Sequence, residues 1–138
     1  MLIDRPVADV FAYVEDWTHA TDYTQSLMVW EPLGEVVDGV GARFRGVMRV
    51  GPTAQESMLE IVRRELDTEI AWESRSGFGQ KGEYTFEAVD GGTRVGFAMD
   101  LTLPGGLAGR MLGAVIGPFA QENTATTLAN LKRILESP

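Results

Sequence analysis

The chain has 138 residues, of which 44% are hydrophobic and 23% charged, values typical of a soluble globular protein with one core. Its formal net charge of −8 argues against binding to nucleic acid or anionic membrane surfaces, because both require a concentrated positive surface. Cysteine is absent, which excludes disulfides, a thiolate nucleophile and cysteine-bound metal and suits a reducing compartment. We expect a single domain over residues 1–138, located in the cytoplasm.

No segment of the sequence predicts a secretory signal or a membrane span. The chain begins MLIDRPVADV, with an acid and a proline where a signal peptide has an apolar run. The most apolar candidate, residues 104–118, is interrupted by Arg110. It is also shorter than the roughly 20 residues that a membrane helix requires. We therefore expect no integral membrane segment.

The stretch DRPVADVFAYVEDW predicts an amphipathic helix near the N-terminus. Pro6 suits the first helical position, where its missing N–H is harmless. The next stretch, DWTHATDYT, is polar with aromatic residues and predicts a short second helical turn. Apolar residues of the first helix fall at i, i+3, i+4 and i+7 and form one buried stripe, Val7, Val10, Phe11 and Val14.

Between residues 27 and 103 the hydrophobic period changes from 3.6 to 2, which predicts a meander of strands. In ARFRGVMRVG, for example, Phe44 and Met48 alternate with Arg45 and Arg49. The loops are too short for helical crossovers, so neighbouring strands run antiparallel. One face of the sheet is apolar and aromatic, and the other is charged. The turns between strands are marked by Asp38-Gly39, Gly51-Pro52, Asp67-Thr68, Gly77 to Gly79 and Asp90-Gly91-Gly92.

The chain closes with a long predicted helix, LAGRMLGAVIGPFAQENTATTLANLKRILESP. Gly117 and Pro118 should bend or break this helix near its middle. Glycine recurs every four residues at positions 105, 109, 113 and 117. Each glycine inside a helix costs about 1 kcal/mol relative to alanine, so this stripe requires an explanation.

Three motifs that suggest catalysis or a cofactor have simpler interpretations. GFGQKG, residues 77–82, matches the GxGxxG fingerprint of dinucleotide-binding folds, but a strand follows it instead of the helix that holds a pyrophosphate. His19 is the only histidine, so a metal site would rest on one imidazole and carboxylates, and we expect it on the surface. Glu73 and Glu83 fall on the charged face by alternation. We therefore expect no metal and no cofactor.

Arginine and glutamate alternate on the charged face of two neighbouring predicted strands. Arg43, Arg45 and Arg49 lie on one strand, and Glu56 and Glu60 lie on the next. This pattern predicts cross-strand ion pairs on a solvated sheet face.

Four polar residues are expected inside the sheet or beneath the C-terminal helix. Once buried, their hydroxyls and amides need hydrogen-bond partners. They satisfy one another, bind internal water or orient an oxygen of a ligand, and the sequence leaves these alternatives open. The four residues are Ser57, Ser74, Tyr84 and Asn123.

The order helix, short helix, antiparallel meander and long C-terminal helix resembles the START-related (SRPBCC) superfamily, above all its polyketide cyclase/dehydrase and lipid-transport-like group. The resemblance spans nearly the whole chain and is carried by RPVADVFAYVEDW, GVGARFRG, ELDTEIAWES, GEYTFEAVDGGTRVGFAMDL and TLANLKRILE. It implies an α+β helix-grip fold, in which a curved antiparallel β-sheet wraps around a long C-terminal α-helix. The family usually begins with a full strand, whereas only MLID precedes Pro6 here.

The resemblance also implies an internal apolar cavity between the sheet and the C-terminal helix. The leading hypothesis is that this cavity binds a small hydrophobic ligand, such as a lipid, a quinone or a polyketide-like molecule. The glycine stripe then marks close packing of the helix on the sheet, an opening of the cavity, or the contact of a homodimer. The candidate ligand-binding residues are Trp30, Phe44, Met48, Leu59, Trp72, Tyr84, Phe86, Phe97, Met99, Met111, Leu112, Val115, Phe119 and Asn123.

Two other classes of function compete with this hypothesis. An enzyme of the polyketide cyclase/dehydratase type would act in the same cavity, with Tyr84, Asn123 or His19 as acid–base groups, although no catalytic residue is assigned. A protein-interaction module would have no cavity, because its aromatic and methionine residues would pack as a solid core. The presence or absence of a cavity separates the last class from the first two.

Overall fold

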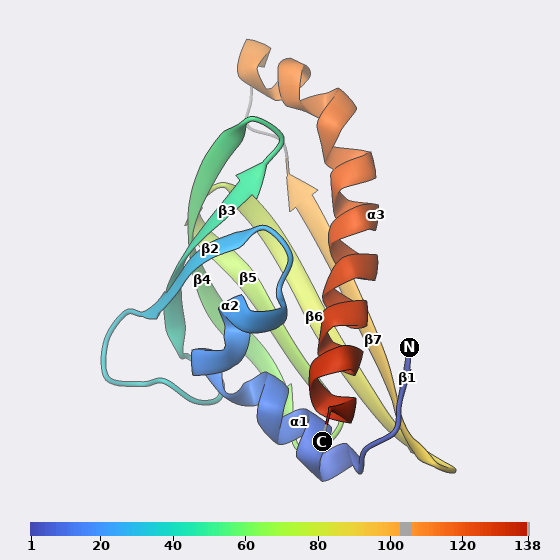
Figure 1. Cartoon of the computed structure of the whole chain (residues 1–138). Helices are drawn as coiled ribbons and strands as arrows, with labels where there is room; N and C mark the ends of the chain where they lie inside the picture. The colour runs from blue at the N-terminus through green and yellow to red at the C-terminus, as the bar shows by residue number, and fades with distance from the viewer. Residues whose placement is uncertain (103–105, 138) are drawn as a thin grey trace.

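The computed structural model describes residues 1–102 and 106–137, and the side chains of residues 1–101 and 118–137. An edge strand and three short helical segments precede a meander of strands, and a long helix follows it (Figure 1). In chain order the elements are β1 (Leu2–Ile3), α1 (Val7–Glu15), η1 (Trp17–His19), α2 (Ala20–Tyr23), β2 (Leu27–Pro32), β3 (Arg43–Val50), β4 (Thr53–Glu65), β5 (Glu69–Gly77), β6 (Gly79–Val89), β7 (Gly92–Thr102) and α3 (Gly106–Glu136).

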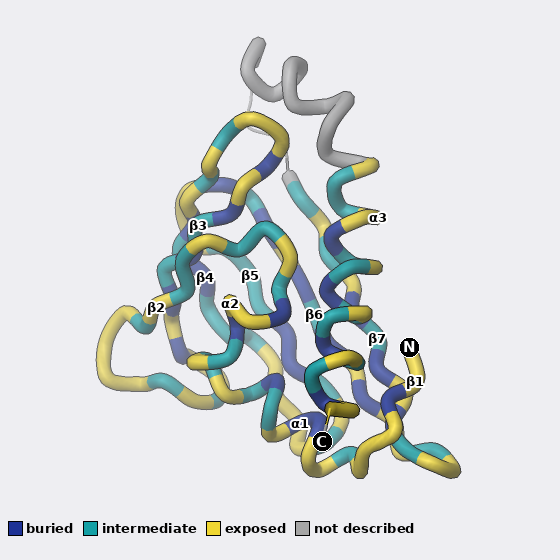
Figure 2. Tube along the Cα trace, in the orientation of Figure 1, coloured by how far each residue is buried: buried dark blue, intermediate teal, exposed yellow. Residues whose placement is uncertain are grey.

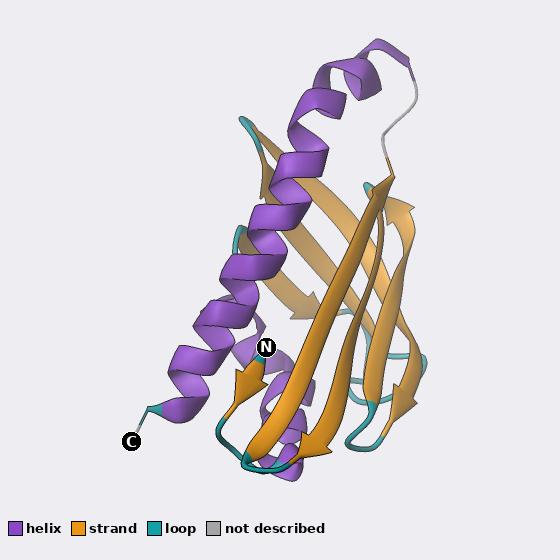
Figure 3. Ribbon diagram, turned by 90° about the vertical axis from the view of Figure 1, so that its right-hand side faces the viewer, coloured by secondary structure: helices purple, strands orange, loops and turns teal. Residues whose placement is uncertain are grey.

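The described strands form a seven-stranded sheet in the order β1-β7-β6-β5-β4-β3-β2, and each neighbouring pair is antiparallel. The sheet curves, and α3 lies along its inner side (Figure 3), which confirms the predicted α+β helix-grip fold. Burial alternates along the strands (Figure 2). In β3, for example, Phe44 and Met48 are buried whereas Arg43 and Arg49 are exposed. The period of 2 in the sequence therefore separates the core face from the solvent face.

The N-terminal helices follow the prediction with a shift of one residue. The buried residues of α1 are Val10, Phe11 and Val14, and η1 with α2 forms the predicted second helical segment. Pro6, expected at the first helical position, instead precedes the helix with φ of −59° and ψ of 146°. Proline fixes φ but leaves ψ free, so Pro6 adopts an extended conformation and α1 begins at Val7.

A bend or a break was predicted at Gly117 and Pro118, and the break does not occur, because α3 runs through Pro118 as one helix. Much of the stability of a helix in a protein comes from packing of its apolar face, which offsets one lost backbone hydrogen bond. In α3 that face carries Leu131 and Leu135, which are buried with Ile3 and Val95. Over the residues that the structure describes, no helix is long and apolar enough to cross a bilayer. The glycine stripe at positions 105–117 lies outside the described side chains, and its three interpretations stay predictions.

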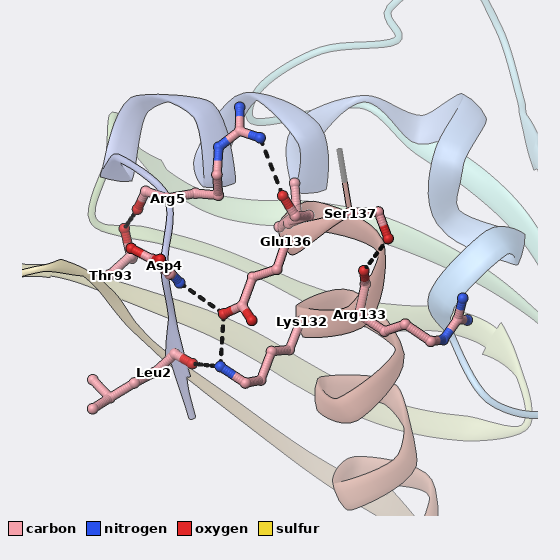
Figure 4. A network of polar contacts seen from close by, with 9 residues as sticks. Leu2, Asp4, Arg5, Thr93, Lys132, Arg133, Glu136 and Ser137 are labelled. Carbon is pink, nitrogen blue, oxygen red and sulfur yellow. Dashed lines mark hydrogen bonds and ion pairs between the residues drawn. The ribbon is translucent and has the colours of Figure 1, made fainter.

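Polar contacts hold the end of α3 against the start of the chain (Figure 4). The Lys132 Nζ donates to the Leu2 carbonyl at 2.7 Å and pairs with Glu136 at 2.6 Å. The Glu136 carboxylate also accepts a hydrogen bond from the Asp4 backbone N–H at 2.8 Å. The two residues of β1 are thus held between β7 and α3.

The outer face of the sheet carries the predicted ion pairs. Arg43 Nε lies 2.8 Å from Glu60, and Arg45 donates to Glu56 at 2.9 Å. Arg49 is exposed on the same strand. Because these groups are solvated, the pairs contribute little to stability, and they make this face of the sheet hydrophilic.

Two other sequence motifs adopt the predicted structural roles. Glu83 pairs with Arg63 at 3.1 Å and Glu73 lies 3.8 Å from Lys81, so neither carboxylate faces the interior. GFGQKG spans the last residue of β5, the connecting residue Phe78 and the first four residues of β6, so no helix follows it. Gly77 has φ of +81°, and a Cβ there would lie 2.3 Å from the carbonyl oxygen of Glu56, so glycine is required for the turn.

Truncation of Leu131 tests how far the fold depends on the packing of α3. Leu131 is fully buried, so Leu131→Ala should lower the free energy of unfolding by about 2–5 kcal/mol, measured by urea denaturation. Leu66 is 62% exposed, so Leu66→Ala is the matched control and should change stability by less than about 0.5 kcal/mol. Equal effects of the two substitutions would contradict the packing described here.

Candidate functional site

An internal cavity of about 100 Å³ lies between the concave face of the sheet and the short N-terminal helices. In a comparable measure one water molecule needs roughly 10–15 Å³, so the space is well above that of a single water. Its described lining residues come from α1, η1, α2, the six strands of the meander and the segment 33–42. They are Val14, Glu15, Trp17, Ala20, Tyr23, Thr24, Leu27, Trp30, Val37, Asp38, Gly39, Phe44, Met48, Ile61, Arg64, Ile70, Trp72, Gln80, Tyr84, Phe97 and Met99.

Aromatic rings form two parts of the cavity wall. Tyr84 stacks on Phe97 with ring centres 4.6 Å apart and planes 9° from parallel, and Trp72 lies 5.7 Å from Tyr84. On the other side Trp30 stacks on Phe44, with centres 4.8 Å apart. Stacked rings are large and have few rotatable bonds, so they give the cavity rigid apolar walls.

Both wall tryptophans stand opposite a glycine on the neighbouring strand. Trp72 pairs with Gly82, and Trp30 pairs with Gly46. A Cβ on Gly82 would lie 2.3 Å from the Trp72 ring, and one on Gly46 would lie 3.2 Å from the Trp30 ring. The missing side chains therefore let both indoles lie close against the sheet.

The cavity opens toward a depression on the surface beside α1. Arg64 donates to both carboxylate oxygens of Glu15, at 2.8 and 3.0 Å, and its guanidinium lies 5.2 Å from the centre of the Phe11 ring. This ion pair joins β4 to α1 at the mouth. The residues that line both the cavity and the depression are Glu15, Trp17, Val37, Asp38, Gly39 and Arg64.

Two of the four predicted interior polar residues have partners within the protein. The Ser57 hydroxyl donates to the Phe78 carbonyl at 2.7 Å. The Ser74 hydroxyl accepts a hydrogen bond from the backbone N–H of Gln80 at 3.0 Å. Both serines therefore stabilise the hairpin of β5 and β6.

Tyr84 and Gln80 bring polar groups to the cavity wall. Burial raises the pKa of Tyr84 well above its usual value near 10. The Gln80 Oε1 accepts a hydrogen bond from the Trp72 indole N–H at 3.3 Å. The sequence prediction missed Gln80, because it began the strand at Lys81. Extending the alternation of Tyr84 back by two steps would have found it.

Asn123 is the buried amide that the sequence singled out on α3. It is 1% exposed, and neither Oδ1 nor Nδ2 has a hydrogen-bond partner within the described part of the protein. One turn later, Thr127 accepts a hydrogen bond from the Gln25 backbone N–H at 3.0 Å. One turn earlier, Phe119 packs against the buried cluster of Met48, Val50 and Phe78. Asn123 thus lies on the buried face of the helix, although it is outside the lining of the cavity.

The predicted site residues divide into three groups. Four residues lie outside the cavity lining: Leu59, Phe86 and Asn123 are buried there, and Phe119 is partly buried. The side chains of Met111, Leu112 and Val115 lie outside the described residues. The cavity brings together the remaining seven, Trp30, Phe44, Met48, Trp72, Tyr84, Phe97 and Met99.

His19 lies apart from the cavity lining. Its ring stacks on Tyr13 with centres 4.1 Å apart, and its Nδ1 lies 3.2 Å from the Tyr13 carbonyl oxygen. In residues 1–101 and 118–137 no three side chains of the types that bind metal gather into a site.

The profile of a family described as polyketide cyclase/dehydrase and lipid transport matches residues 1–136 of the chain. A comparison of the chain with curated protein sequences found no match.

Several solved structures share the fold over nearly the full length. TTHA0849 from Thermus thermophilus is 20% identical, with 98% of this chain and 92% of that chain covered and a TM-score of 0.81. The aromatase/cyclase Zhui from Streptomyces sp. R1128 is 14% identical, with coverages of 99% and 90% and a TM-score of 0.79. A START superfamily protein from Mycobacterium smegmatis is 11% identical, with coverages of 98% and 94% and a TM-score of 0.71. At these identities the likeness establishes the fold.

The glycine opposite Trp72 should be much less tolerant of substitution than the one opposite Trp30. In Gly82→Ala the new Cβ would displace the Trp72 ring, at a cost of about 1–3 kcal/mol and with a changed near-ultraviolet circular dichroism spectrum. Gly46→Ala is the matched control, because a shift of a few tenths of an ångström by Trp30 accommodates it. Similar spectra and stabilities for the two variants would contradict this geometry.

Replacing Asn123 with an apolar residue should stabilise the protein. A buried amide without partners costs about 1–3 kcal/mol, so Asn123→Leu is expected to raise the midpoint of thermal unfolding in the absence of ligand. Thr127→Val removes a hydroxyl that has a partner and should lower the midpoint. A loss of stability in Asn123→Leu would show that the Asn123 amide has hydrogen-bond partners.

Proposed function

The chain belongs to the polyketide cyclase/dehydrase and lipid-transport family, and we propose that it binds a small hydrophobic ligand in the cavity between the sheet and its helical cover. The observation that carries the proposal is the cavity, about 100 Å³ in volume and walled mainly by aromatic and aliphatic side chains. Ligand pockets characteristically combine such apolar walls with a few polar groups. The cavity also favours this function over an interaction module with a solid core.

Affinity would come mainly from removing apolar ligand surface from water. Burying about 200 Å² of ligand surface at about 25 cal/mol per Å² contributes about 5 kcal/mol, from which the entropic cost of association is subtracted. The ligand contacts that we propose are the seven predicted residues that line the cavity. Asn123 is a further candidate, because its unpartnered amide lies on the helix face between Phe119 and Thr127.

Binding is favoured over catalysis by the acid–base properties of the cavity. A general acid or base works best with a pKa near the working pH. Burial raises the pKa of the Tyr84 phenol, further from neutral pH, so the phenol keeps its proton there. His19 lies outside the described lining, and Glu15 and Arg64 neutralise each other at the mouth. The structural neighbour Zhui is named as an aromatase/cyclase, and at 14% identity only its fold extends to this chain.

Two finer expectations belong to the same proposal. A cytoplasmic location is supported by the absence of cysteine from the chain. A homodimer contact at the glycine stripe stays a prediction, and sedimentation analysis of the purified protein would test it.

Filling the cavity with a side chain should abolish binding. Ala20 lines the cavity and is 9% exposed, so Ala20→Phe should lower the affinity for N-phenyl-1-naphthylamine at least tenfold, measured by its fluorescence. Ala54 lies on the exposed side of β4, and Ala54→Phe is the matched control with unchanged affinity. Circular dichroism checks that both variants fold, and Ala20→Leu provides a smaller obstruction. Failure of the unmodified protein to bind the probe would refute the proposed function.

A further inference from the structure

The two hydrogen-bonding side chains of β6 that line the cavity stand away from its mouth. Gln80 and Tyr84 both line the cavity, and neither borders the surface depression into which it opens. Both are nearly inaccessible to solvent, at 6% and 5% exposure. Any ligand group that meets them has therefore left bulk water.

The orientation of the Gln80 amide follows from the chemistry of its neighbour. An indole N–H can only donate, so the atom that receives the Trp72 hydrogen bond must be the amide oxygen of Gln80. The amide nitrogen is then the free end of the side chain. Within the described part of the protein it has no hydrogen-bond acceptor, and Gln80 presents donors to the cavity.

Tyr84 also presents a donor. Its ring is fixed by stacking on Phe97, and its phenol stays protonated because burial opposes ionisation. A phenol hydroxyl donates as well as accepts, so its hydrogen is available to a ligand oxygen.

The charged groups of the described lining are confined to the mouth. They are Glu15, Asp38 and Arg64, and the single cation among them is paired with Glu15. A ligand carboxylate at Gln80 and Tyr84 would meet donors but no compensating charge. Burying an uncompensated anion is far more costly than burying a neutral oxygen.

We propose that the natural ligand is an uncharged apolar molecule with carbonyl-type oxygens, which accept hydrogen bonds from the Gln80 amide nitrogen and the Tyr84 hydroxyl. This inference rests on the proposed function and names its ligand class. Gln80 and Tyr84 are then the residues that determine specificity, while the surrounding rings supply affinity.

Three aromatic probes of similar size separate the contributions of oxygen and charge. They are naphthalene, 2-acetylnaphthalene, which adds a neutral carbonyl, and 2-naphthoate, which adds an anion. Quenching of tryptophan fluorescence at pH 7.5 gives their affinities. A neutral hydrogen bond from either donor should make the ketone bind about threefold to tenfold more tightly than naphthalene, with naphthoate the weakest.

Variants then assign that preference to residues. Of Gln80→Leu and Tyr84→Phe, the variant that removes the donor used by the ketone should lower the affinity for the ketone about threefold to tenfold, and both should change that for naphthalene less than twofold. Glu87→Gln, on the exposed face of the same strand, is the matched control and should change none of the three. Because Gln80→Leu also removes the acceptor of the Trp72 indole, an unchanged affinity for naphthalene checks that the Trp72 wall is intact.

The outcomes distinguish failure of this inference from failure of the proposed function. Equal affinities for naphthalene and the ketone, or tightest binding of naphthoate, would overturn the inference while leaving a hydrophobic binding site. A preference for the ketone that survives in both Gln80→Leu and Tyr84→Phe would overturn the assignment to these residues. Binding of none of the probes would overturn the proposed function itself.

Discussion

The hollow interior depends on where the long helix is anchored. The buried face of α3 packs against Ile3 and Val95 at one edge of the sheet, and Lys132 holds it there by its bond to the Leu2 carbonyl. A helix is about 10–12 Å across and strands are about 4.8 Å apart, so one helix covers roughly two strands. The remaining concave surface is covered by α1, η1 and α2 (Figure 1), and the cavity is the space that these short elements leave.

An unfilled interior lowers the stability of the protein without ligand. At about 24 cal/mol per Å³, a cavity of about 100 Å³ costs about 2 kcal/mol. The unpartnered Asn123 amide adds about 1–3 kcal/mol. A ligand present at a hundred times its Kd stabilises the folded state by about 2.7 kcal/mol, which is of the same size as the cost of the cavity. The stacked rings and the glycine–tryptophan pairs keep the walls apart, so the space does not close by collapse of the side chains.

Local patterns in the sequence predicted the fold well, whereas the cavity depends on contacts between distant elements. Alternation placed Phe44, Tyr84 and Phe97 inside and the arginines of β3 outside, because a strand has a strict period of two. The same rule placed Leu59 and Phe86 inside as well, but it does not say where along the sheet the covering elements lie. Phe86 is therefore covered by Phe11 of α1 and belongs to the packed core. Gln80 was missed because the glycines around it look like a turn, although β6 already begins at Gly79.

If the proposed ligand class is right, the distribution of charge makes the cavity selective through desolvation. The guanidinium of Arg64 is engaged by Glu15 at the mouth, so it does not accompany an anion inward. Inside, the polar groups of Gln80 and Tyr84 are neutral dipoles, which act more strongly in a low-dielectric interior than in water. A neutral carbonyl gives up weak hydration and regains a hydrogen bond, whereas a carboxylate gives up strong hydration for the same bond. Selectivity then arises from the difference in hydration between ligands. Rigid walls are sufficient for it, because no charged group has to move into the cavity.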